Sequence, residues 1–133
     1  MHPLLEKASG LTETIIAAAI EVHRDNGPAL VESICEWCLL KELELRDLNC
    51  VSQKFVLFEY KGFTREKPLR FDLQAEGCAL VEAKAVEKVL PIHKAQLLSY
   101  MKLLNVPIGL LINFHERKVT DGTSRLILPE ANR

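Results

Sequence analysis

The sequence has no apolar run that could cross a bilayer, because its longest runs, such as residues 108–112, are far shorter than the ~20 residues of a transmembrane helix. It also has no dominant charge, since 17 Lys and Arg stand against 18 Asp and Glu, for a net charge of −1. No global basic field can therefore attract a nucleic acid, and any such binding needs a local basic patch. Repeats, linkers and low-complexity segments are absent as well, so the 133 residues predict one globular domain, 1–133.

The cysteines do not occur at the spacing of a zinc site. Cys35 and Cys38 form a C-x-x-C pair inside a helical pattern, while Cys50 and Cys78 are isolated. We expect Cys35 and Cys38 to bind no zinc and to form no disulfide with each other, because a helix holds their side chains in poor bridging geometry. The N-terminus lacks the basic start and the long apolar stretch of a secretory signal. These features predict a cytoplasmic protein with reduced thiols and no membrane partner.

Two helices are predicted in the first third of the chain. Apolar residues recur at spacings of three and four over residues 11–25, where Thr12 is a plausible cap. A second helix is predicted over residues 30–46, after the turn formed by Asn26-Gly27-Pro28. Its expected buried side consists of Ile34, Trp37, Cys38, Leu40 and Leu43.

The rest of the chain alternates strands with one further helix. The pattern predicts strands over residues 53–60, 69–75 and 79–86, a helix from Pro91 to about Asn105, a strand buried on both faces over 107–114, and a short strand over 125–128. In the second strand, Phe71 and Leu73 are expected to face one way and Asp72 the other. The order predicts an α/β fold with a central mixed β-sheet flanked by helices.

Three charged residues on neighbouring predicted strands suggest a metal site. Strand alternation can place Asp72, Glu82 and Lys84 on one face of the sheet. Paired carboxylates suit Mg²⁺ or Mn²⁺, and a lysine beside them can steer a water and offset charge in a transition state. A cross-strand salt-bridge cluster is the alternative. The small residues Ala83 and Ala85 favour the metal site, because they indicate a closely packed central strand in which charge is costly.

Six segments, in order over about nine tenths of the chain, carry a resemblance to a known family. They are Val22-His23-Arg24 and residues 27–33, 70–73, 81–88, 91–100 and 109–114. The sequence resembles the PD-(D/E)XK nuclease superfamily and, within it, the small GxxExxY protein family. This resemblance implies the α-β-β-β-α-β core that the element pattern also predicts. It further implies a metal-dependent nuclease that hydrolyses phosphodiester bonds of DNA or RNA.

The resemblance also assigns roles to single residues. It implies that Asp72 and Glu82 bind Mg²⁺ or Mn²⁺ and that Lys84 is the catalytic lysine. Glu32, on the second predicted helix, would be an extra acidic residue that reaches toward the metal. Gln96 and Tyr100 match the Q-x-x-x-Y element of RecB-type exonucleases; they share one helix face and would contact a metal-bound water or the nucleic-acid backbone. A hydrogen bond on the helix surface is an equally good interpretation of that pair.

Other polar residues are weaker candidates for substrate contact. His93 opens the third predicted helix and is a candidate to accept a proton or contact a phosphate, although one-metal lysine nucleases need no histidine. For His23, a hydrogen-bonded structural role is favoured. A local basic patch, with a solvated lysine face as the alternative, would consist of Lys88, Lys94, Lys102, Arg65, Lys67 and Arg70.

Two residues depart from the pattern that names the GxxExxY family. That pattern needs glycine at position 29 and tyrosine at position 35, where this chain has Ala29 and Cys35. Neither change touches Asp72, Glu82 or Lys84. Two other functions stay open: a binding module built on an inactive nuclease core, and a subunit that needs a homodimer or a partner protein, because a chain of this size has little surface with which to hold a duplex.

Overall fold

The structure, a computed structural model, describes residues 2–27 and 31–129, without the side chains of residues 53, 54, 56 and 67–70. Ala29 therefore lies outside the described residues. The elements are α1 (Leu5–Asn26), α2 (Glu32–Leu45), β1 (Cys50–Tyr60), β2 (Phe63–Ala75), β3 (Ala79–Lys84), α3 (Pro91–Leu104), β4 (Ile108–Asn113), the short 3₁₀ helix η1 (Val119–Gly122) and β5 (Thr123–Ile127).

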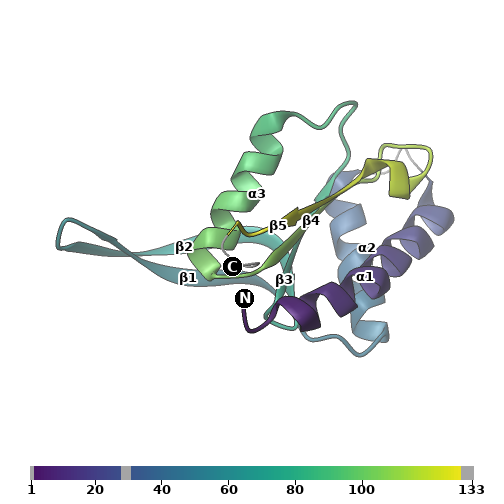
Figure 1. The fold of residues 1–133 in the computed structure, drawn as a ribbon. Helices are drawn as coiled ribbons and strands as arrows, with labels where there is room; N and C mark the ends of the chain where they lie inside the picture. Colours follow the sequence, from purple (N-terminus) through teal and green to yellow (C-terminus); the bar gives the residue numbers. More distant parts are fainter. Residues whose placement is uncertain (1, 28–30, 130–133) are drawn as a thin grey trace.

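The strands form one mixed sheet in the order β1-β2-β3-β4-β5. Among the strands that the structure describes, only the β3–β4 pair is parallel, and α3 is the crossover that joins these two strands. Helices α1 and α2 cover one face of the sheet and α3 covers the other (Figure 1). The α/β fold with a mixed sheet flanked by helices is thus confirmed.

The two faces of the sheet carry separate apolar clusters. Leu39 of α2 packs with Val81 and Ile112 on one face, whereas Leu97 of α3 packs with Leu80 on the other. Every residue of β4 is buried, as its apolar run predicts. Each fully buried Leu or Ile stabilises the fold by about 1.5–3 kcal/mol, so β3 and β4 form the rigid centre that positions the residues at their ends.

Glycine at position 109 allows α3 to approach the sheet closely. A Cβ built on Gly109 would lie 2.6 Å from the sulfur of Met101 and 3.1 Å from a methyl carbon of Leu97. A larger residue would push α3 away from β4, because neither neighbour is at the surface. The helix that follows β3 is therefore held close against the sheet.

Two predictions about the helices are wrong. Helix α1 begins at Leu5, and Thr12 lies inside it, where its hydroxyl donates to the carbonyl of Ala8 at 3.3 Å instead of capping the helix. The buried side of α2 is formed by Cys35, Leu39 and Leu43, at spacings of four. Ile34 and Trp37, which we expected to be buried, are 45% and 60% exposed. Helix α2 is apolar on more than one side, so its periodicity did not identify the face that packs.

A register shift explains a wrong prediction for β2. Phe71 packs in the cluster on the α3 side and Leu73 in the cluster on the α1–α2 side, although alternation predicts that they share a face. The β1–β2 ladder shifts between Val51 and Gln53, which oppose Gln74 and Arg70, so β2 contains two extra residues there. Such a bulge bends the strand and redirects its side chains. Asp72 lies within this bulge.

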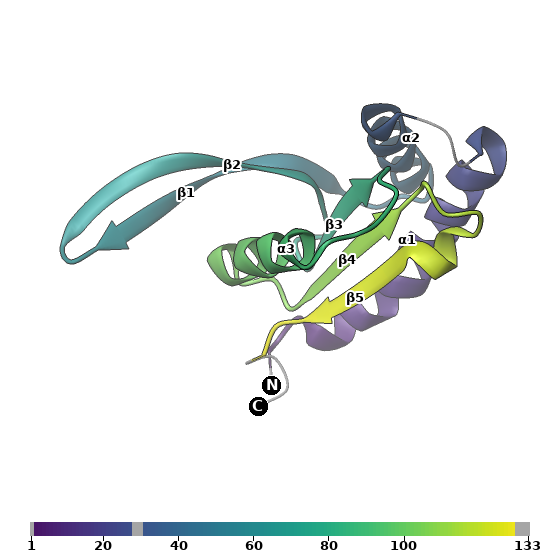
Figure 2. The same cartoon turned by 90° about the horizontal axis from the view of Figure 1, so that it is seen from above.

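Beyond the bulge, on the side of the turn between β1 and β2, these strands form a two-stranded arm, residues 53–70. This arm projects from the rest of the molecule (Figure 2). Large apolar side chains on this arm are exposed: Phe55 at 65%, Leu57 at 68%, Tyr60 at 69% and Phe63 at 78%. No helix among the described residues is long and apolar enough to cross a membrane.

Candidate metal and nucleic-acid site

The central feature of the site is the point where β2 separates from β3, which we call the β2–β3 fork (Asp72, Glu82 and Ala83). Backbone pairing of these strands covers residues 73–75 of β2. At the fork, carboxylates take the place of backbone acceptors. Oδ2 of Asp72 accepts a hydrogen bond from the N–H of Ala83 at 2.6 Å, and Oε1 of Glu82 accepts one from the N–H of Asp72 at 3.2 Å. The fork therefore holds both carboxylates side by side and leaves each a second oxygen.

Helix α2 brings two more carboxylates to the fork. Oε1 of Glu32 accepts a hydrogen bond from the N–H of Ala85 at 3.2 Å, which ties the first turn of α2 to the end of β3. Glu36 lies one turn later, close enough to Asp72 for each carboxyl group to shift the pKa of the other. Glu36 was not among the predicted site residues, although its spacing of four from Glu32 was the available signal.

Burial and mutual repulsion raise the pKa values of these carboxyl groups. Burial, followed by the charge of Glu82, raises the pKa of Asp72 from 3.8 to about 7, against the opposing hydrogen bond from Ala83. Burial is also the main cause of the raised pKa of Glu82 and of Glu36. The fork thus concentrates negative charge where protein groups compensate it poorly.

Lys84 is the nearest candidate cation. Its charge lowers the pKa of both Asp72 and Glu82, so it lies within electrostatic reach of the two carboxylates. Between the described side chains, however, the ion pairs involve Arg24, Lys41 and Arg46, and none involves the residues of the fork. The alternative of a cross-strand salt-bridge cluster is therefore not formed in the described part of the chain.

A buried asparagine fixes the backbone next to Lys84. Asn113 is opposite Lys84 in the β3–β4 register and is only 1% exposed. Its Nδ2 donates to the carbonyl of Val86 at 2.8 Å, and its Oδ1 accepts from the N–H of Val86 at 3.1 Å and of His115 at 3.2 Å. Asn113 was not among the predicted site residues, and its signal in the sequence was a single amide at the end of an otherwise apolar strand.

The α3 residues predicted to contact the substrate are not bonded to the fork among the described contacts. Because α3 runs back from the end of β3, its first turns lie at the fork end of the sheet, and Lys94 and Gln96 are exposed there. Tyr100 is half-buried and packs against the apolar cluster under α3. No hydrogen bond links these three residues to the fork among the described contacts. The side chain of Arg70 lies outside the described residues.

His93 stabilises the start of α3. Its Nδ1 accepts a hydrogen bond from the N–H of Leu90 at 3.0 Å. In the neutral ring the proton is then on Nε2, which makes His93 a hydrogen-bond donor toward any ligand. This arrangement suits contact with a phosphate better than acceptance of a proton.

The donor set at the fork fits a hard divalent cation only in part. The described residues contain no group of three or more His, Cys, Asp or Glu side chains placed to hold a metal ion. Mg²⁺, however, is commonly bound by one or two carboxylates together with waters and substrate phosphates. Asp72 and Glu82 offer two carboxylates, and their raised pKa values indicate that a cation would relieve their repulsion.

One comparison with known proteins found a match. A family model described as the PD-(D/E)XK nuclease superfamily matches residues 9–126, which include the fork, both helices that flank it and β4. Neither a search of curated proteins nor a search of solved structures found a match.

Proposed function

Because the chain belongs to the PD-(D/E)XK nuclease superfamily, we propose that it hydrolyses phosphodiester bonds of DNA or RNA at the β2–β3 fork, with Mg²⁺ or Mn²⁺ as cofactor. One observation supports the proposal above others. Two carboxylates with raised pKa values stand side by side next to a lysine that pairs with neither of them in the described structure. Charge placed in this way is costly for folding, so a role in binding is its best explanation.

The proposed roles of the residues follow from their chemistry. Asp72 and Glu82 would hold the cation through the carboxylate oxygens that do not cap the fork, and Glu32 would reach it from α2. A bound divalent cation would lower the pKa of a water and offset the charge of the phosphate. Lys84 would orient the attacking water and stabilise the negative charge that develops on the phosphoryl oxygens.

The substrate would lie along the fork end of α3. Lys94 and the Nε2–H of His93 would donate to backbone phosphates, which position a strand without reading its sequence. Gln96, Tyr100 and Arg70 are further proposed contacts. We also propose that the chain is a member of the GxxExxY family within the superfamily, on the strength of Glu32 and the segments that follow it.

A panel of labelled substrates tests this function. Single-stranded, duplex, flapped and branched DNA and RNA are incubated with wild type and with Glu82→Gln, in Mg²⁺, in Mn²⁺ and in EDTA. We expect cleavage of at least one substrate by wild type with either cation, and none in EDTA or by the variant. Wild-type protein that binds a substrate in EDTA but cleaves nothing with cation would support an inactive binding module instead.

A second candidate function rests on the exposed apolar side chains. Phe55, Leu57, Tyr60 and Phe63 on the arm, together with Trp37 on α2, leave large apolar groups in contact with water. Monomeric proteins rarely expose contiguous apolar patches of more than a few hundred Å². These surfaces favour a subunit of a homodimer or of a larger complex. Measuring the mass of the protein in solution tests the homodimer.

A further inference from the structure

A cavity of about 270 Å³ lies where the end of α1 meets the segment before η1, and we call it the α1–η1 pocket. Its lining includes apolar Ile20 and Val119 and the basic or imidazole side chains of His23, Arg24, Arg117 and Lys118. Among the described residues, no carboxylate lines it. A concave surface with charge of one sign focuses the electrostatic field and attracts ligands of the opposite sign.

Hydrogen bonds hold the walls of this pocket in place. The ring Nε2 of His23 lies 2.7 Å from the carbonyl oxygen of Glu116 and donates to it, which joins α1 to the segment after β4. The hydroxyl of Thr123 donates to the carbonyl of Val119 at 2.7 Å. A Cβ at Gly122 would lie 2.6 Å from the carbonyl oxygen of Asn113, so the segment packs tightly back onto β4. The basic side chains thus project from a fixed frame.

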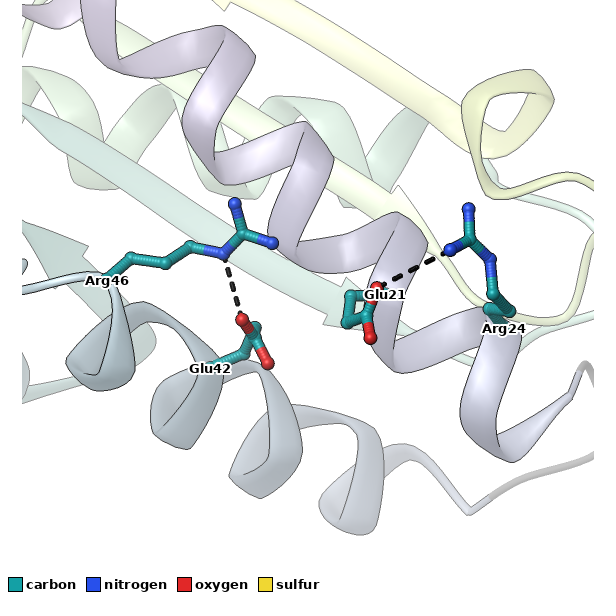
Figure 3. A network of polar contacts seen from close by, with 4 residues as sticks. All are labelled: Glu21, Arg24, Glu42 and Arg46. Carbon is teal, nitrogen blue, oxygen red and sulfur yellow. Dashed lines mark hydrogen bonds and ion pairs between the residues drawn. The ribbon is translucent and has the colours of Figure 1, made fainter.

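The positive charge of the pocket is mostly uncompensated. Arg24 pairs with Glu21 at 3.7 Å, and both side chains are exposed, so solvent screens the pair (Figure 3). No ion pair involves Arg117 or Lys118 among the described residues. Two guanidinium groups and an ammonium therefore surround a small cavity in a chain whose net charge is −1.

This chemistry matches a phosphate group. The planar guanidinium binds two phosphate oxygens at once, and a lysine adds a point charge. A backbone hydrogen bond also links the pocket to the strand that carries the fork. The N–H of Phe114, three residues before Arg117 in the sequence, donates to the carbonyl of Lys84 at 2.7 Å. We propose that the α1–η1 pocket binds a phosphate group, and that in the proposed nuclease this is a phosphate of the nucleic-acid substrate, an extension that rests on the proposed function.

The test compares wild type with three variants of the protein. The pocket variant, Arg117→Gln/Lys118→Gln, removes two charges from the pocket. The control variant, Lys7→Gln/Lys41→Gln, removes two exposed charges elsewhere, and the charge-keeping variant is Arg117→Lys/Lys118→Arg. Binding is measured in EDTA with inorganic phosphate, a nucleoside 5′-monophosphate, and oligonucleotides of about 12 residues with and without a 5′-phosphate. Thermal melting checks that each variant is folded.

We expect the pocket variant to bind oligonucleotides about tenfold more weakly, and the slope of log K against log[salt] to become shallower by about 1 for each phosphate that the protein no longer neutralises. The control variant and the charge-keeping variant should stay within about threefold of wild type. If the pocket variant loses affinity only for the 5′-phosphorylated oligonucleotide, the ligand is a terminal phosphate. If it loses affinity for the oligonucleotides with and without a 5′-phosphate alike, the ligand is a backbone phosphate. A loss seen with the monophosphate or inorganic phosphate alone would identify a free phosphate compound.

Equal binding of every probe by wild type and the pocket variant would overturn the proposal. Cleavage assays distinguish a failure of the phosphate-binding proposal from a failure of the proposed nuclease function. If the pocket variant still cleaves with an unchanged KM, the nuclease function stands and the phosphate site in the pocket is rejected. If phosphate binding depends on Arg117 and Lys118 but wild type cleaves nothing, the phosphate site stands and the nuclease function is rejected.

Discussion

The β2–β3 fork and the α1–η1 pocket lie at the same end of the sheet, but they carry opposite charge and hold it in different ways. At the fork, Asp72 and Glu82 are partly buried, cap backbone N–H groups and have raised pKa values. In the pocket, Arg117 and Lys118 are exposed and stand on a rigid frame. Buried charge is costly and needs a partner, while exposed charge costs little and attracts ligands from solution.

This difference suggests a division of labour. A cation bound at the fork would relieve carboxylate repulsion, and a phosphate in the pocket would neutralise basic side chains. A phosphodiester hydrolase needs both kinds of surface, because its cation and its substrate carry opposite charge. If the difference is functional, variants of the fork should affect chemistry and stability together, and variants of the pocket should affect substrate binding alone.

The largest effect is expected for Glu82→Ala. The substitution removes a proposed metal ligand and the acceptor of the Asp72 N–H, so cleavage should be abolished and cation binding strongly weakened. Cleavage assays and metal titration measure the two effects. A variant that cleaves at the wild-type rate would show that the fork is not the active site.

Lys84→Ala should separate chemistry from cation binding. Removal of a positive charge from beside two carboxylates should leave cation binding level or tighter, while cleavage falls by about two to three powers of ten. Lys84 makes no ion pair in the described structure, but its charge lowers the pKa of both carboxyl groups, so the melting temperature of the metal-free protein should fall modestly and a divalent cation should restore most of the loss. A large drop in melting temperature with unchanged cleavage would assign a structural role to this lysine.

Asp72→Asn should stabilise the metal-free protein at alkaline pH. The pKa of Asp72 is raised from 3.8 to about 7, so the unfolded chain ionises this group before the folded protein does. Wild type therefore loses stability from about pH 4 to about pH 7, with no further loss above that range. Asparagine keeps an oxygen for the Ala83 N–H, and at pH 8 it should gain about 1–2 kcal/mol after allowance for solvent screening. Equal denaturation curves at pH 4 and pH 8 for both proteins would contradict the raised pKa.

The smallest effect is expected for Glu36→Gln. The charge of Glu36 raises the pKa of Asp72 and of Glu82, so its removal should move both toward their ordinary values and weaken cation binding by about threefold. Carboxyl carbon NMR titration of Asp72 measures the shift. An unchanged titration would place Glu36 outside the electrostatics of the fork.

The sheet and the fork were predictable because they depend on local patterns. Alternation located β3, the apolar run located the buried strand β4, and Pro91 marked the start of α3. Asp72 and Glu82 were expected to lie together because a tight turn joins β2 to β3, and this pairing holds although the bulge breaks the alternation of β2 at Asp72. These features depend only on residues near one another in the sequence.

Features that depend on tertiary packing were not predictable. The bulge in β2 arises from its pairing with β1, so alternation misplaced Phe71, and the apolar sides of α2 did not reveal which one packs. Glu36 interacts with Asp72, which lies 36 positions away in the sequence, and Asn113 interacts with Val86, which lies 27 positions away. No spacing rule connects such partners. The pocket was not predictable either, because its walls come from the two ends of the chain.

Calorimetric titration of Mn²⁺ into the wild type and into Asp72→Asn/Glu82→Gln, in buffers of different ionisation enthalpy, tests the fork most directly. A cation requires ionised carboxylates, and the pKa of Asp72 is about 7. The proposed function predicts saturable binding by wild type, with about one proton released per ion near pH 6 and almost none near pH 8.5, and no binding by the variant. Equal heats for both proteins, or binding by wild type without proton release at the lower pH, would contradict a metal site at the fork.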